Sequence, residues 1–154
     1  MSLDLASLLP ILLPRAIAWA ERQEKRVLAE GTPLSAHWQA LARSVGVQEP
    51  ERIRVVVVDA LPLPDDPDLQ AFALQTGLLG PGMIGLTLGY AVFACRGHDA
   101  SPRLLSHEFR HVHQYEVFGS IKQFLPVYLE QIAQFGYDDA PLEEDARANE
   151  KENA

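Results

Sequence analysis

The stretch LLSHEFRHVHQY, residues 104–115, decides the fold of this chain. It contains the pattern H-E-x-x-H, in which His107 and His111 are four positions apart and Glu108 follows the first histidine. On an α-helix, residues four apart point the same way, one turn above the other, so both imidazoles can reach one metal ion. Glu108 lies beside that face, where its carboxylate can hold a water molecule. The pattern therefore predicts a zinc site on a helix and favours metal-assisted hydrolysis.

The helix that carries this pattern is expected to run from Pro102 to Phe118, with Gly119 closing it. Apolar residues share one stripe with the two motif histidines, which predicts that these histidines lie on the buried side of the helix. His113 points about 200° away from His111, from roughly 100° per residue. We therefore expect His113 at a surface or an interface and not at the ion.

Composition and charge limit the class of protein. With 154 residues the chain is long enough for one domain with a real core, so residues 1–154 are read as a single domain with a frayed end at 149–154. The net charge of −8 argues against nucleic acid as a partner. Cys95 is the single cysteine, which excludes an internal disulfide and a cysteine-based zinc site. Nothing favours secretion, and we expect a cytoplasmic protein.

The apolar segment from Leu8 to Ala20 resembles a signal peptide only in its hydrophobicity. The chain lacks a positive region before it, and Arg15 interrupts it. It is also too short to span a bilayer. We read it as a buried packing segment, part of it in a helix from Pro14 to about Glu30, with reversible membrane contact as a minor alternative.

The remaining pattern predicts an α+β fold, with several helices packed on a small three-stranded sheet. Strands are expected over 52–59, 84–88 and 91–95, the last two forming a hairpin around Gly89-Tyr90 beside the first. Further helices are expected over 35–44, 67–76 and 120–135 and from about Pro141 onward.

A catalytic zinc usually has three protein ligands and keeps a fourth position for water. His37 and His98 could in principle supply the third ligand, but their spacing from the motif does not recommend them. The acidic segment PLEEDAR, residues 141–147, is the sharper candidate. It begins its own helix after the helical stretch 120–135, so the chain can run away from the ion and return to it.

An H-E-x-x-H pattern followed, after a helical excursion, by a second helix that begins with Glu resembles the gluzincin group of zinc metallopeptidases. The match covers Leu104 to Arg147, and no membrane-spanning helices accompany it. It implies a zincin-like domain of the kind found in small soluble bacterial proteins, with Glu143 as the third zinc ligand and Glu144 as the fallback. Arg147 stands where the relatives carry an aspartate, and this departure leaves the residue that would support a zinc ligand unidentified.

The resemblance also implies a peptide or protein substrate, bound as an added strand at a sheet edge, which we expect to be the strand 91–95. Glu108 is the candidate general base. Tyr137, the tyrosine closest in sequence to Glu143, is the candidate donor to an oxyanion. Two alternatives stay open: a zinc-binding or scaffold protein that retains a peptidase fold without catalysis, and a metal-free helix in which the histidines simply pack. Glu143 also has a structural explanation, because an acid in the first turn favours a helix.

Overall fold

The computed structural model describes residues 5–154, which form six α-helices and four strands. In chain order the elements are α1 (Leu5–Glu30), β1 (Thr32–Pro33), α2 (Ala36–Ser44), a 3-10 turn (Pro50–Arg52), β2 (Arg54–Val58), α3 (Pro67–Thr76), β3 (Gly85–Leu88), β4 (Ala91–Cys95), α4 (Pro102–Phe118), α5 (Ile121–Phe135) and α6 (Pro141–Ala148). The expected α+β class is confirmed.

The sheet has four strands in the order β1-β2-β4-β3, and the expected number of three is wrong. The additional strand, β1, has two residues and pairs antiparallel with β2. Strand β4 lies between β2, to which it is parallel, and β3, to which it is antiparallel. The expectation that the strand 91–95 forms an edge is therefore wrong as well. On the side of the sheet away from β1, the edge strand is β3.

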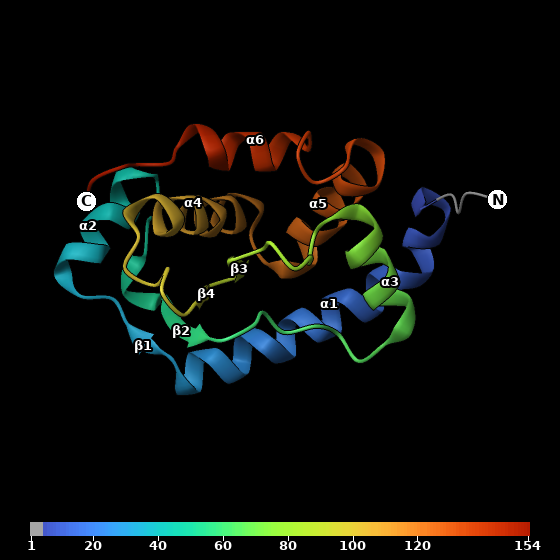
Figure 1. Cartoon of the computed structure of the whole chain (residues 1–154), viewed down its shortest axis with the longest axis horizontal. Coiled ribbons are helices and arrows are strands. Elements are labelled where there is room, and N and C mark those ends of the chain that lie inside the picture. Colours follow the sequence, from blue (N-terminus) through green and yellow to red (C-terminus); the bar gives the residue numbers. More distant parts are fainter. Residues whose placement is uncertain (1–4) are drawn as a thin grey trace.

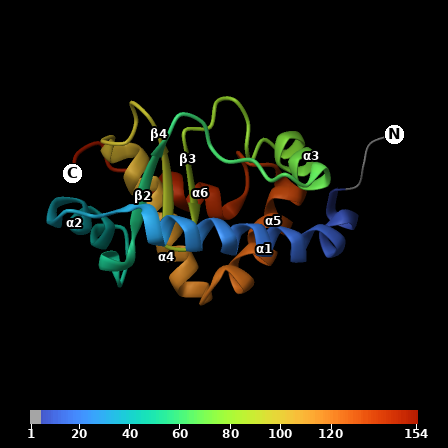
Figure 2. The same ribbon diagram turned by 90° about the horizontal axis from the view of Figure 1, so that it is seen from below.

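Helices cover both faces of the sheet. Figure 1 shows α4 on one side of the strands and α1 on the other, and α6 lies beyond α4. In the view turned by 90°, α1 crosses in front of β2, β4 and β3 (Figure 2). Helix α5 packs against α1, and α6 packs along α4. The central helix is thus enclosed between the sheet and the C-terminal helix.

Two hydrophobic clusters fill the spaces on the two faces, and β4 contributes to both. Val92 packs with Leu105, Phe109 and the residues of α2 on the α4 face. Phe93, the next residue, packs with α1 and α5 on the opposite face. Because successive strand residues point to opposite faces, one short strand joins the two clusters.

The two ends of α4 are formed by local signals, and the expected bounds of this helix are confirmed. At its start the Ser101 hydroxyl accepts a hydrogen bond from the backbone N–H of Leu104, and Pro102 occupies the first helical position. At its end Gly119 has φ +111°, which is costly for a residue with a side chain. The motif residues therefore lie in the interior of a helix with defined ends.

Helix α1 begins at Leu5, nine residues before the expected start at Pro14, and it contains both Pro10 and Pro14. Each proline removes one backbone donor from the helix. The helix continues through them because Leu9 and Leu12 are buried in the cluster that α1 shares with α5. None of the helices in the described part of the chain has both the length and the apolar character needed to cross a membrane.

Candidate metal centre

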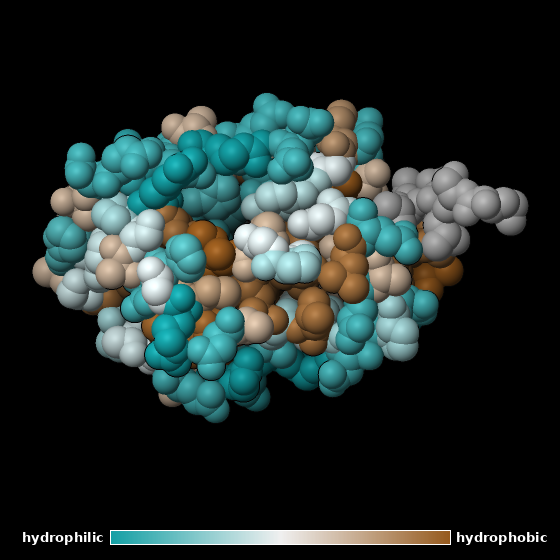
Figure 3. Space-filling model, in the orientation of Figure 1, coloured by the Kyte–Doolittle hydropathy of each residue, from teal (hydrophilic) through white to brown (hydrophobic). Residues whose placement is uncertain are grey.

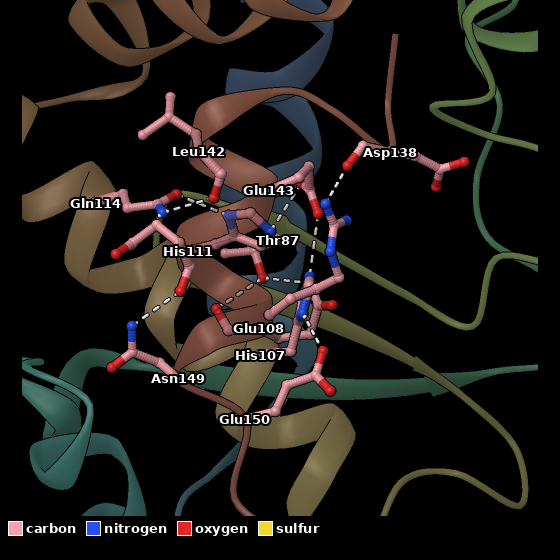
Figure 4. Close-up of polar contacts among 12 residues, drawn as sticks. Thr87, His107, Glu108, His111, Gln114, Asp138, Leu142, Glu143, Asn149 and Glu150 are labelled. Carbon is pink, nitrogen blue, oxygen red and sulfur yellow. Dashed lines mark hydrogen bonds and ion pairs between the residues drawn. The ribbon is translucent and has the colours of Figure 1, made fainter. Parts of the chain in front are cut away.

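Three buried side chains converge between α4 and α6. His107 and His111 come from consecutive turns of α4, and Glu143 comes from the first turn of α6. Each offers one ligand atom, and these atoms lie within 4.8 Å of one another. Figure 4 shows the two imidazoles directed toward the Glu143 carboxylate. The structure therefore brings together the three predicted ligands in a group that could hold a metal ion.

The distances within this group suit a small cation. His107 Nε2 lies 3.1 Å from Glu143 Oε1, and His111 Nε2 lies 2.9 Å from Glu143 Oε2. A tetrahedral zinc ion with bonds of roughly 2.0–2.2 Å separates its ligand atoms by about 3.3–3.5 Å. Each of these two contacts would lengthen by a few tenths of an ångström if the ion were bound. Ala140 caps α6, and the Glu143 side chain is only 1% exposed, so the carboxylate is held in place.

The hydrogen bonds of Gln114 fix the tautomer of His111. The Gln114 amide nitrogen donates to the backbone oxygen of Leu142 and to Asp145, at 2.9 Å each. Its amide oxygen must therefore face His111 Nδ1, which lies 2.8 Å away and must donate the proton. Neutral His111 then carries its lone pair on Nε2, the atom that faces Glu143. Arg110 anchors Asp145 in turn, at 2.8 and 3.1 Å.

A second acceptor holds His107 in the same way. His107 Nδ1 lies 2.9 Å from the carboxylate of Glu150, which also accepts from Arg103. A carboxylate can only accept from the imidazole, so Nδ1 carries the proton and Nε2 is free to bind a cation. Arg147 donates to the backbone oxygen of Asp138 and not to either imidazole. The acceptor for His107 thus comes from the segment after α6, beyond residues 104–147.

The segment that was expected to fray at the C-terminus supplies this support. The backbone N–H of Lys151 donates to the Ser106 hydroxyl at 2.7 Å, and Glu150 forms ion pairs with Arg103 and with His107 if that ring is charged. Residues 150 and 151 are therefore attached along the N-terminal half of α4. No sequence signal indicated this contact, because it depends on the direction in which the chain leaves α6.

The charges of the group favour cations at both Nε2 positions. Burial opposes a charge on His111, but the carboxylate of Glu143 outweighs it and raises the pKa of His111 to about 9. The pKa of His107 is also raised, since burial is offset by the hydrogen bond to Glu143 and the charge of Glu108. Burial would raise the pKa of Glu143, yet His111 and His107 hold it far below its usual value. A divalent cation would replace the protons that bridge these groups.

Glu108 lies next to the metal group but points toward β3. Its Oε1 accepts from the hydroxyl of Thr87 at 2.8 Å. Its Oε2 passes close to Gly85, where a Cβ atom would stand 2.9 Å from that oxygen. Burial raises the pKa of Glu108, and the charges of His107 and His111 offset this only in part. A buried carboxyl group with a raised pKa suits the transfer of a proton near neutral pH.

Two tyrosines approach the same carboxylate. The hydroxyl of Tyr128 donates to Glu143 Oε2 at 2.6 Å, and its ring stands at 6.1 Å from that of His111. Burial, the charges of Glu143 and Glu108 and a hydrogen bond to Glu143 raise the pKa of Tyr137, the tyrosine selected from the sequence. Tyr137 therefore lies beside the metal group, where it lines the same cavity as His111 and Glu143. Tyr128 was missed as a contributor because its spacing in α5 equally suits the hydrophobic core.

Several other sequence candidates lie away from the group. Glu144, the fallback ligand, is exposed on α6. His37 and His98 are exposed too and do not belong to the cluster. His113 is half-buried, and its Nδ1 lies 2.9 Å from the backbone oxygen of Gly46 rather than near the ion site.

No family model, no curated protein and no solved structure matches this chain.

Proposed function

We propose that this protein is a zinc-dependent metallopeptidase with the active-site plan of the gluzincins. The observation that carries the proposal is the convergence of two Nε2 atoms and one carboxylate, with each imidazole held at Nδ1 by a separate acceptor. Such acceptors orient metal-bound histidines and increase their basicity. A donor set of two imidazoles and a carboxylate with a base nearby is typical of catalytic zinc.

The residues of the site would have separate roles in the reaction. Zinc bound to His107, His111 and Glu143 would polarise a scissile carbonyl and lower the pKa of water. Glu108 would take a proton from the attacking water and pass it to the leaving amine. Thr87 would hold one oxygen of Glu108, leaving the other to act. Tyr137, which is half-buried, would donate a hydrogen bond to the oxyanion.

Strand β3 is the element that would hold a peptide. Cys95 N–H donates to the backbone oxygen of Ile84, so this pair and every second pair after it are hydrogen-bonded in the β3–β4 hairpin. Gly85 and Thr87 belong to the intervening pairs and turn their backbone N–H and C=O groups away from β4. The Thr87 oxygen accepts a hydrogen bond from the hydroxyl of Tyr115 at 3.2 Å, so an extended peptide could pair by strand addition with the backbone groups of Gly85.

The alternative of a structural zinc site or a scaffold differs in the number of ligands. A structural zinc site is usually closed by a fourth protein ligand. Within residues 5–154 the group has three His, Cys, Asp or Glu members, all of which have been named. This favours catalysis over a structural role. We also propose the cytoplasm as the compartment, in which the free Cys95 would remain reduced.

The test compares two variants of α4 for zinc content and for cleavage of a denatured protein substrate. Glu108→Gln should keep about one zinc per chain and lose at least a hundredfold in activity. His107→Ala should lose both. Glu130→Gln, an exposed change on α5, is the matched control and should alter neither. Equal cleavage by Glu108→Gln and the unchanged protein would refute the mechanism.

A further inference from the structure

Glu143 belongs to a helix that cannot hold its own position. Helix α6 has eight residues, and Ala140 at its N-cap makes no side-chain hydrogen bond to the first turn. Isolated helices shorter than about 12 residues are marginal in water, so contacts with other elements must fix this one. Figure 3 shows a hydrophilic band along the outer side of α6, which faces solvent. The position of Glu143 therefore depends on α4 and α5, which α6 contacts on its inner side.

Helix α5 contacts the start of α6 through two polar side chains. Tyr128 and Gln131 are three positions apart on α5 and therefore neighbours on one face of that helix. The side-chain oxygen of Gln131 accepts from the backbone N–H of Leu142 at 2.9 Å, which supplies the cap that Ala140 lacks. The hydroxyl of Tyr128 donates to Glu143 Oε2 at 2.6 Å. Gln131 thus fixes the first turn of α6, and Tyr128 acts on the carboxylate itself.

The hydrogen bond from Tyr128 makes the two oxygens of Glu143 unequal. Oε2 shares part of its negative charge with the hydroxyl, whereas Oε1 lies 3.1 Å from His107 Nε2. Oε1 is therefore the better donor to a cation. The Tyr128 ring is buried and stacks on Phe124 with the ring centroids 5.2 Å apart, so its hydroxyl is held in this direction.

We propose that Tyr128 is a positioning residue that directs one oxygen of Glu143 to the metal and keeps the carboxylate from binding with both. This inference rests on the proposed function. Carboxylates bind cations through either one or two oxygens. A catalytic zinc site keeps a fourth position for water, and a second carboxylate oxygen would compete for that position. Tyr128 would thus contribute to hydrolysis without touching the substrate.

The hydroxyl, and not the ring, distinguishes this role from packing in the core. A phenylalanine at position 128 would stack on Phe124 in the same way and would not place a polar group in the interior. The hydroxyl instead finds its acceptor in a carboxylate that also contacts both motif imidazoles. Removing this one oxygen atom therefore tests the proposal with little change in packing.

The test compares Tyr128→Phe with Tyr115→Phe as the matched control. Tyr115 is also buried, but it donates to the backbone oxygen of Thr87 and not to Glu143. Each protein is loaded with cobalt(II), whose visible absorption weakens as its coordination number increases. We expect the molar absorbance to fall about twofold or more in Tyr128→Phe and to stay unchanged in Tyr115→Phe. Zinc affinity, measured by competition with a chelator, should fall about tenfold in Tyr128→Phe alone.

A second pair of variants separates the hydroxyl from the position of the helix. Gln131→Leu removes the acceptor for Leu142 and should lower zinc affinity, but it retains the hydroxyl of Tyr128 and should keep the cobalt spectrum of the unchanged protein. Gln131→Glu keeps an acceptor and should restore the affinity. The same loss of absorbance in Gln131→Leu as in Tyr128→Phe would show that the hydroxyl has no specific role and would overturn the proposal.

The cobalt spectrum decides the outcome independently of cleavage. An unchanged spectrum in Tyr128→Phe would overturn the proposal even if zinc affinity fell, because packing alone would explain the lower affinity. Equal changes in Tyr128→Phe and Tyr115→Phe would overturn it as well. A weaker spectrum in Tyr128→Phe without cleavage by the unchanged protein would refute the proposed hydrolysis but support the positioning role, and cleavage with an unchanged spectrum would do the reverse.

Discussion

The Glu143 carboxylate should make the stability of the metal-free protein depend on pH in a defined direction. It contacts both motif imidazoles, and it is the group that raises the pKa of His111 to about 9. A histidine with a raised pKa stabilises the folded state fully below its unfolded pKa, and this contribution is lost as the pH rises through the folded value. We therefore expect the zinc-free protein to lose stability between about pH 6.5 and pH 9.

The magnitude follows from the two pKa values of His111. The difference between the ordinary 6.5 and about 9 in the folded protein corresponds to about 3 kcal/mol below pH 6 and to about 2–3 kcal/mol at pH 7. The lowered pKa of Glu143 describes the same contact from the other side and is not added. Glu143→Gln removes the contact, so at pH 7 the variant should unfold about 5–10 °C below the unchanged protein.

The assay is urea unfolding of chelator-treated protein at several pH values from 6 to 9.5. Glu144→Gln is the control, because Glu144 lies in the same helical turn but is exposed. It makes the same change in charge near the helix start and should retain the pH dependence of the unchanged protein. In Glu143→Gln the loss of stability between pH 6.5 and pH 9 should disappear.

Zinc binding should become stronger as the pH rises, whereas the stability of the zinc-free protein should fall. The ion competes with protons for Nε2 of His111, so its apparent affinity should rise about tenfold for each pH unit between 7 and 9. Chelator-buffered zinc titrations over that range measure this slope. The reasoning is refuted if Glu143→Gln and Glu144→Gln show the same pH profile without metal, or if zinc affinity does not change with pH.

Two further variants test the supports of the site. Glu150→Gln weakens the acceptor at His107 Nδ1 and should lower zinc affinity by about 10–100-fold. The exposed change Glu152→Gln is its control. Equal zinc affinities of the two variants would exclude a positioning role for Glu150. Gly85→Ala places a Cβ atom 2.8 Å from Leu104 Cδ1 and 2.9 Å from Glu108 Oε2, so we expect a loss of about 1–3 kcal/mol in urea unfolding together with reduced cleavage. A fully stable and active Gly85→Ala protein would show that Glu108 does not need the close approach to β3.

Local signals made some elements predictable to the residue. Helix α3 runs from Pro67 to Thr76 as expected, because Asp66 accepts from the backbone N–H of Asp68 and Leu69, and Gly77 ends the helix with φ +82°. Helix α4 has the same kind of ends. Such signals lie within a few positions of the boundary and act before any tertiary contact forms.

Features that depend on distant contacts were not predictable in this way. The early start of α1 depends on packing against α5, which lies about a hundred positions further along the chain. Strand β1 has only two residues and includes Pro33, so its pattern carries no strand signal. In the observed sheet β4 lies between β2 and β3. The sequence predicted the β3–β4 hairpin but did not indicate which of its two strands would pair with β2.

The H-E-x-x-H pattern alone is weaker support for a metal site than the arrangement of the side chains around it. H-E-x-x-H arises by chance in helices, because His and Glu are common helix residues. What distinguishes this helix is that the Nδ1 atoms of His107 and His111 are both occupied by acceptors, Glu150 and Gln114, that come from different parts of the chain. Both remaining lone pairs then face one carboxylate, an arrangement that is repulsive unless protons or a cation lie between them.

Arg147 and Glu150 show how His107 is supported in this chain. The chemistry requires an acceptor at His107 Nδ1, but it does not require that acceptor to come from α6. In this chain the segment after α6 continues along α4 toward its N-terminal end (Figure 1), and Glu150 reaches the imidazole while Arg147 is held by the backbone of Asp138. Glu150 thus supplies the acceptor because it lies next to His107 in space, although it follows α6 in the sequence. A search for this kind of site should therefore ask what holds each imidazole, and only then whether a family motif is intact.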